Sequence, residues 1–76
     1  MYYIIERWEE EPGHEVESIE ELSTHDEDIA HLTAYARWVG MSIQKAKKRT
    51  SFELIETSEF YRDTDGAGYT LIHKYK

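Results

Sequence analysis

The chain has 76 residues, of which 39% are hydrophobic, 13% aromatic and 33% charged, and its formal net charge is -7. So short a chain has room for one hydrophobic core, which excludes two independent domains, and its aromatic content excludes a disordered chain. It contains no cysteine, hence no disulfide framework and no thiolate zinc site, and we expect a reducing, cytoplasmic setting. Nothing in the sequence resembles a signal peptide or a membrane span of about 18 apolar residues, so we expect no membrane association.

The charge is divided unevenly along the sequence. Residues 1–28 contain eleven acidic residues and a single base, Arg7, whereas residues 29–76 contain five acidic residues and eight bases. A uniform excess of acid indicates little beyond solubility, but this excess is concentrated in the first third of the chain. The acidic third is therefore the first place to look for a binding surface.

The chain begins with two predicted strands. Residues 2–8 are β-branched and aromatic and alternate in polarity, with Tyr2 and Tyr3 on opposite faces. Residues 11–14 match a type II turn, because proline fixes the backbone at its second position and glycine accepts a positive φ at its third. The turn predicts a short second strand, residues 14–18, that pairs with the first.

One long helix is predicted next. Ser18–Glu21 and Thr24–Glu27 both have the spacing of a capping box, and the second begins the helix. Apolar residues then recur at steps of three and four and define one apolar face, which consists of Ile29, Leu32, Ala36, Val39, Ile43 and Ala46. A glycine inside a helix costs about 1 kcal/mol, less than this face gains from packing. We therefore expect a continuous helix over about residues 25–49. The alternative is that it ends at Gly40 and that residues 41–45 are extended.

Two further strands complete the chain. Residues 51–61 and 69–75 alternate, with Ile72 expected on the face opposite Tyr75, and residues 63–68 signal a hairpin turn between them. The order of elements predicts a small α+β domain over residues 1–76, an antiparallel sheet with one long helix packed on one face. One helix does not easily cover both faces, so some of the aromatic side chains are expected on the open face: Tyr2, Trp8, Phe60, Tyr61, Tyr69 and Tyr75.

The residues that commonly carry catalysis or bind metals form no recognisable set. His25, Asp28 and His31 project too far apart around a helix to share one ion, which favours ordinary surface histidines. A carboxylate pair is expected by chance among sixteen acidic residues, and the Gly66–Gly68 segment lacks the helix and the lysine of a phosphate loop. We predict no catalytic residue, no metal and no cofactor.

A single basic cluster consists of Lys45, Lys47, Lys48 and Arg49. Beside aromatic strands, such a cluster is a possible nucleic-acid platform. Cations in the last turn of a helix also complement its dipole, and a net charge of -7 repels a phosphate backbone. We favour the dipole interpretation and expect direct nucleic-acid binding only as a third hypothesis.

The acidic third supports the leading hypothesis. Carboxylates at alternate positions of a strand recur about every 6.8 Å, a spacing comparable to that of phosphates along a nucleic acid. We expect a small inhibitor or modulator, of the kind that phages and mobile elements encode, that docks a carboxylate-rich face onto the basic, nucleic-acid-binding surface of a host protein. The predicted contact residues are Glu9, Glu10, Glu11, Glu15, Glu17, Glu20, Glu21, Asp26, Glu27 and Asp28.

The main alternative is a protein–protein adaptor or self-associating module. It would use the open aromatic face of the sheet, with Tyr61 and Tyr69 as its contact residues and a homodimer as one outcome. The acidic third also has an explanation that needs no partner: it is a solvated surface that keeps a small protein in solution.

Overall fold

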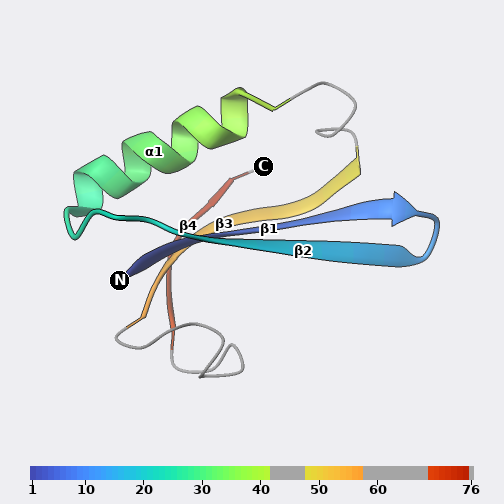
Figure 1. Cartoon of the computed structure of the whole chain (residues 1–76), viewed down its shortest axis with the longest axis horizontal. Helices are drawn as coiled ribbons and strands as arrows, with labels where there is room; N and C mark the ends of the chain where they lie inside the picture. Colours follow the sequence, from blue (N-terminus) through green and yellow to red (C-terminus); the bar gives the residue numbers. More distant parts are fainter. Residues whose placement is uncertain (42–47, 58–68, 76) are drawn as a thin grey trace.

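The computed structural model describes residues 1–41, 48–57 and 69–75. They form strands β1 (Tyr2–Glu11) and β2 (His14–Glu21), helix α1 (Glu27–Val39), and strands β3 (Arg49–Glu56) and β4 (Thr70–Tyr75). The strands make one antiparallel sheet in the order β2-β1-β3-β4, and α1 lies against one face of it (Figure 1). The predicted α+β fold is confirmed. The predicted turn at residues 63–68 and the residue Tyr61 lie outside the described residues.

The hairpin of β1 and β2 forms where the turn residues predict it. Gly13 has φ +80°, a backbone conformation that other residues rarely adopt. Both strands are longer than predicted, because β1 continues through its three glutamates to Glu11 and β2 continues to Glu21. Glutamate has a low intrinsic preference for strands, so pairing between the two strands, rather than propensity, extends them.

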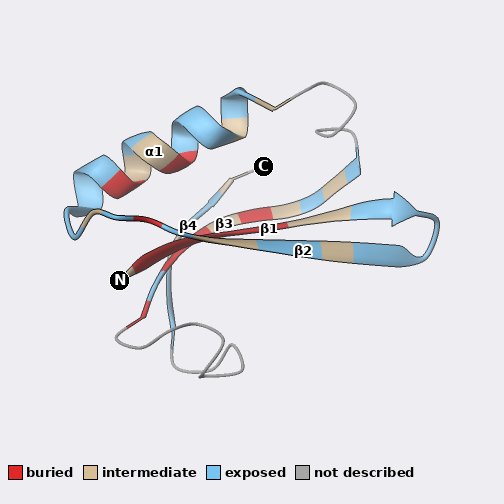
Figure 2. Cartoon of the chain, in the orientation of Figure 1, coloured by how far each residue is buried: buried red, intermediate tan, exposed pale blue. Residues whose placement is uncertain are grey.

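The core lies between the sheet and α1. Alternation along β1 and β3 puts Ile4 and Leu54 on the face toward the helix and Ile5 and Ile55 on the other face. The buried residues on the helix side are Tyr2, Ile4, Leu22, Ala30, Ala34, Phe52 and Leu54 (Figure 2). Tyr3, Ile5 and Ile55 form a second buried cluster on the other face, beside Met1 and Ile19. Both faces of the central strands are therefore apolar.

Two of the six aromatic candidates for the open face lie on the other face, and the predicted alternation of Ile72 and Tyr75 is wrong. Tyr2 and Tyr75 pack on the helix side of the sheet rather than on its open face, and Tyr75 stacks edge-on against Phe52 at 5.5 Å between ring centroids. Ile72 packs on the same side as Tyr75, although simple alternation puts them on opposite faces. The reason is an irregularity in the pairing of β3 with β4: Leu54 is opposite His73 and Ile55 opposite Leu71, which leaves Ile72 as an extra residue.

Helix α1 turns its predicted apolar face toward solvent. Ala30 and Ala34 are fully buried against the sheet, whereas Ile29, Leu32 and Val39 are exposed. The prediction assumed that the larger apolar residues face the core. The sheet already presents large side chains to the helix, so only a face of small residues lets the helix approach closely enough to pack without overlap. The exposed face on α1 is the main feature that periodicity alone misplaced.

The helix is also shorter than predicted. It ends at Val39 rather than near residue 49, and the Gly40 N–H donates a hydrogen bond to the Ala36 carbonyl at 3.0 Å. A Cβ at position 40 would lie 2.9 Å from that carbonyl oxygen, closer than side chains approach. The glycine therefore permits the close turn that terminates the helix, and the alternative interpretation of Gly40 is correct on this point.

The helix begins with a different cap from the predicted one. Asp26, not Thr24, is the N-cap residue, and its Oδ1 accepts hydrogen bonds from the Asp28 and Ile29 N–H groups at 2.9 and 3.1 Å. The Thr24 hydroxyl accepts a hydrogen bond from the Asp26 N–H at 3.0 Å and so supports the cap. A carboxylate at this position satisfies two free N–H groups and also complements the helix dipole.

Replacing Asp26 with alanine is expected to lower the free energy of unfolding by about 1 kcal/mol, because two N–H groups lose their acceptor. The measurement is urea denaturation followed by circular dichroism. Asp28→Ala is the matched control, since it removes the same charge from the first turn without removing a cap. Equal losses in the two variants would show that charge, rather than the cap, accounts for the effect.

Candidate functional site

The outer half of the β1–β2 hairpin projects beyond the rest of the sheet. The described part of β3 pairs with β1 only as far as Trp8, which is opposite Arg49, so residues 9–15 pair only with each other in a two-stranded ribbon, and Val16 and Glu17 pair with Trp8 and Arg7 at its inner end. Residues 9–15 and Glu17 are exposed, and α1 lies over the other end of the sheet (Figures 1 and 2). We call residues 9–17 the acidic arm.

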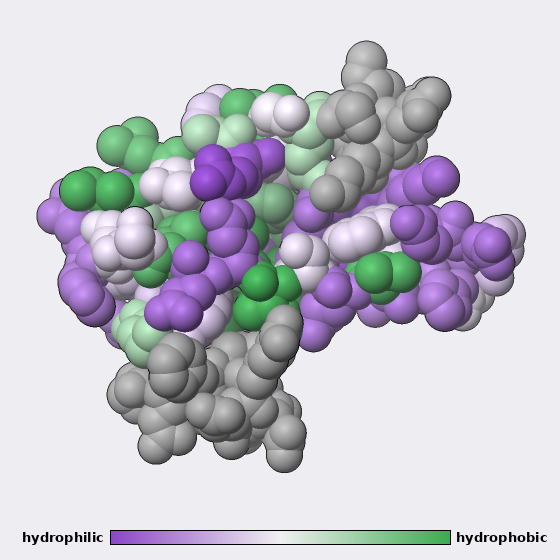
Figure 3. Space-filling model, viewed as in Figure 1, coloured by the Kyte–Doolittle hydropathy of each residue, from purple (hydrophilic) through white to green (hydrophobic). Residues whose placement is uncertain are grey.

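The arm holds five carboxylates and no lysine or arginine: Glu9, Glu10, Glu11, Glu15 and Glu17. Glu9 lies directly opposite Glu15, and the register shifts between Glu9 and Glu11, so Glu10 is the extra residue of an irregularity. Like charges directly opposite one another on neighbouring strands destabilise a sheet. Hydrophilic residues dominate this part of the surface in the view of Figure 3. The arm thus concentrates charge at a cost to its own stability.

Arg7 neutralises the carboxylate at the inner end of the acidic arm. Its guanidinium lies 2.7 Å from the Glu17 carboxylate on β2 and 3.1 Å from that of Glu53 on β3. Partial burial lowers the pKa of Arg7, but the charge and hydrogen bond of Glu17, together with those of Glu53, outweigh it and raise the pKa above its usual value. The only base among residues 1–28 is therefore held in a bridge across three strands.

The tip of the arm has no such partner. Glu15 accepts a hydrogen bond from the Thr50 hydroxyl at 2.8 Å, which leaves its charge in place. Across residues 1–41, 48–57 and 69–75, no lysine, arginine or histidine forms an ion pair with Glu9, Glu10 or Glu11. These three adjacent carboxylates are open to a partner.

The other predicted contact residues lie elsewhere. Glu20 is paired with Arg37 of α1 at 3.1 Å, and the hydrogen bond and charge of Glu20 raise the pKa of Arg37. Glu21 is opposite Tyr3, six residues along β1 from Glu9 and so roughly 20 Å away at about 3.3 Å per residue. Asp26, Glu27 and Asp28 surround the start of α1, at the end of the sheet remote from the arm (Figure 1). The ten carboxylates therefore form two groups rather than one continuous face.

The predicted basic and aromatic contact residues are only partly described. Lys45, Lys47 and Tyr61 fall in the segments outside the described residues, whereas Lys48 is exposed and Tyr69 is 38% exposed. Arg49 lies 5.4 Å from the centroid of the Trp38 ring and 2.7 Å from the Met41 sulfur, so it is packed against the protein. A cation stacked in this way is less free to contact a phosphate.

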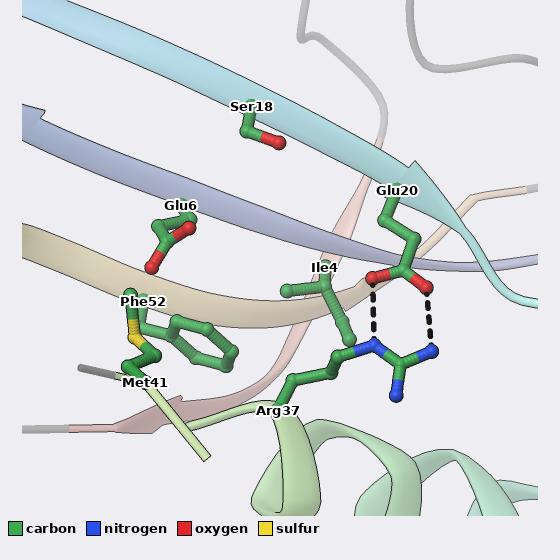
Figure 4. Close-up of a pocket in the computed structure, with 7 residues that line it drawn as sticks. All are labelled: Ile4, Glu6, Ser18, Glu20, Arg37, Met41 and Phe52. Atoms are coloured by element: carbon green, nitrogen blue, oxygen red, sulfur yellow. Dashed lines mark hydrogen bonds and ion pairs between the residues drawn. The ribbon is translucent and has the colours of Figure 1, made fainter. Parts of the chain in front are cut away.

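A shallow pocket of about 200 Å³ lies between the sheet and the end of α1 (Figure 4). Glu6 reaches it from β1, Glu20 and Arg37 form its polar rim, and Met41 and Phe52 form its apolar side. Ligand sites for small molecules usually have volumes of about 300 Å³ or more. Within the described ranges, no three histidine, cysteine, aspartate or glutamate residues are grouped as metal ligands. None of the helices described is both long and apolar enough to cross a membrane.

Two features of the surface escaped the sequence analysis. The ion pair between Arg7 and Glu53 was missed because the two residues are far apart in the sequence. Only the register of β1 with β3 brings them together. The exposed face of α1 was assigned to the core.

Comparison of the chain with protein-family models, with curated proteins and with solved structures finds no match. The function of the chain is therefore inferred from its own geometry.

Proposed function

We propose that the protein is a small binding protein that docks its acidic arm onto a basic surface of another protein, of the kind that binds nucleic acid, and thereby inhibits or modulates it. The observation that carries the proposal is the group Glu9, Glu10 and Glu11. They are exposed and have no ion-pair partner among the described residues, and Glu9 also faces Glu15 across the hairpin.

The geometry of the arm supports this mode of binding. A two-stranded ribbon that projects from a compact body reaches into a groove that the body itself does not enter, and successive residues on one face of it are about 6.8 Å apart. A basic partner would relieve the repulsion between Glu9 and Glu15, so the unfavourable charge arrangement in the free protein becomes favourable in the complex. Such binding is steered by charge and weakens steeply as salt is added.

The test is an affinity pull-down from a bacterial lysate at about 0.05 M and about 0.5 M salt, between which the screening length falls severalfold. We expect a basic nucleic-acid-binding protein to be retained at low salt only, and to be released by added duplex DNA. The triple variant Glu9→Gln/Glu10→Gln/Glu11→Gln should lose it.

The matched control removes three charges from the other acidic group, by Glu21→Gln/Glu27→Gln/Asp28→Asn, and should retain the partner. Equal loss in both variants would mean that net charge, not the arm, mediates binding. Retention that survives high salt, or that duplex DNA does not displace, would contradict the proposal.

A further inference from the structure

Helix α1 carries four of the six large hydrophobic residues that are exposed in the described part of the chain. Ile29 is 51% exposed, Leu32 70%, Tyr35 55% and Val39 54%. Residues 29–36 include no aspartate, glutamate, lysine or arginine, although a third of the chain is charged. Large apolar side chains grouped on one face without charges are typical of the centre of a protein interface.

The spacing of this face is that of a narrow helix–helix seam. Ile29, Leu32, Ala36 and Val39 follow one another at steps of three, four and three, which is the pattern of two helices that pack side by side. The same steps read identically in both directions. The seam is thus compatible with a copy of itself running the opposite way.

The sizes of the side chains favour that antiparallel arrangement. When two such helices cross about a two-fold axis near residue 34, Ile29 meets Val39 of the second copy and Leu32 meets Ala36 of the second copy. Leu32 is then opposite the small Ala36, so these central layers interdigitate, and Ile29 and Val39 form an apolar contact on either side of them. In a parallel pair, Ala36 would face Ala36 and leave a gap between two large residues.

The charges at the two ends of the helix select the same arrangement. Asp26, Glu27 and Asp28 surround its start, whereas Arg37 lies in its last turn. Arg37 is already paired with Glu20, and Arg49, next to Met41 after the helix, is stacked on the Trp38 ring, so this end has only a weak positive charge. An antiparallel pair brings the acidic end of each helix to the end of the other that has no excess of acid, and opposes their dipoles. A parallel pair would bring acid against acid.

We propose that α1 is a self-association surface through which two copies of the chain form an antiparallel, two-fold symmetric dimer. The seam spans only about 15 Å, ten residues at 1.5 Å each, so the dimer is a modest one with a dissociation constant on the order of 10–100 μM. In the view of Figure 1, α1 and β1 run in roughly the same direction, so the dimer places the two acidic arms at opposite ends. The dimer does not depend on the function proposed for the arm.

Sedimentation equilibrium of the full chain tests the dimer, over concentrations from about 5 μM to about 1 mM that bracket the expected dissociation constant. We expect a reversible monomer–dimer equilibrium in the wild type. Leu32→Glu, at the most exposed position of the seam, should raise the dissociation constant by at least about 100-fold, because it places a charge at the centre of an apolar contact.

The control is Leu71→Glu, the same substitution at a leucine that is 47% exposed on β4 and remote from the seam in the fold, and it should dimerise like the wild type. Circular dichroism checks that both variants remain folded. A wild type that stays monomeric to about 1 mM, or a dimer that Leu71→Glu abolishes and Leu32→Glu does not, would overturn the proposal.

Cysteine cross-linking tests the direction of the helices, since the chain has no cysteine of its own. Leu32→Cys and Ala36→Cys chains are mixed in equal amounts and oxidised, and the antiparallel dimer predicts that the disulfide between the two different chains exceeds the sum of the two disulfides between identical chains, which is the value that random pairing gives. Excess of the disulfides between identical chains would show a parallel arrangement and contradict this dimer.

Discussion

Leu54→Ala is expected to lower the free energy of unfolding by about 3–4 kcal/mol, the cost of a cavity left by a fully buried leucine. Leu54 has no exposed surface and sits on a central strand, opposite Ile4 on β1 and His73 on β4, facing the helix. The strands on both sides are fixed by their own pairing, so the space is not easily refilled. In a domain of this size the loss corresponds to a fall in melting temperature of about 15 °C or more.

The measurement is urea denaturation at low protein concentration, where any dimer is dissociated. Leu71→Ala, on the neighbouring strand but 47% exposed, is the control and should cost less than about 1 kcal/mol. Similar losses for both leucines would mean that the sheet does not have the register described above.

The second prediction concerns the face of α1 that packs on the sheet. Ala34→Leu should destabilise the monomer by about 2–3 kcal/mol, because three extra carbons have no room at a fully buried position. Ala36→Leu makes the same change two residues away, on the exposed face, and should alter the stability of the monomer by less than about 0.5 kcal/mol.

The two alanine variants discriminate directly between the helix orientation in the structure and the one that periodicity favours. If the face containing Ile29, Leu32 and Ala36 packed against the sheet, Ala36→Leu would be the harmful change and Ala34→Leu would be tolerated. Denaturation of both variants in parallel, again at low concentration, decides between the two orientations.

The strands were predictable because their signals are local. Alternation separated Tyr2 from Tyr3, and the Pro12–Gly13 turn set the first hairpin. The acidic arm was partly predictable too, since Glu9, Glu10, Glu11, Glu15 and Glu17 surround that turn in the sequence. Their exposure, the Glu9–Glu15 pairing and the bridge from Arg7 to Glu53 follow from the register, which joins residues far apart in the chain.

The orientation of the helix was not predictable in the same way. Hydrophobic periodicity identifies an apolar face, but it does not say whether that face meets the chain's own sheet or another molecule. In α1 a face of small residues, Ala30 and Ala34, competes with the face of larger ones. The bulky side chains that the sheet directs at the helix decide the competition by steric fit, and a single helical segment contains no information about them.

The sequence by itself therefore determined the order of the elements, the α+β class, the first turn and the concentration of acid in the first third, because each depends on neighbouring residues. Only the tertiary structure decided that the carboxylates divide into an arm and a helix-end group, because sheet register sets which residues share an end. It also decided that the predicted core face of α1 is exposed, because packing against a particular sheet selects among faces that periodicity leaves equivalent.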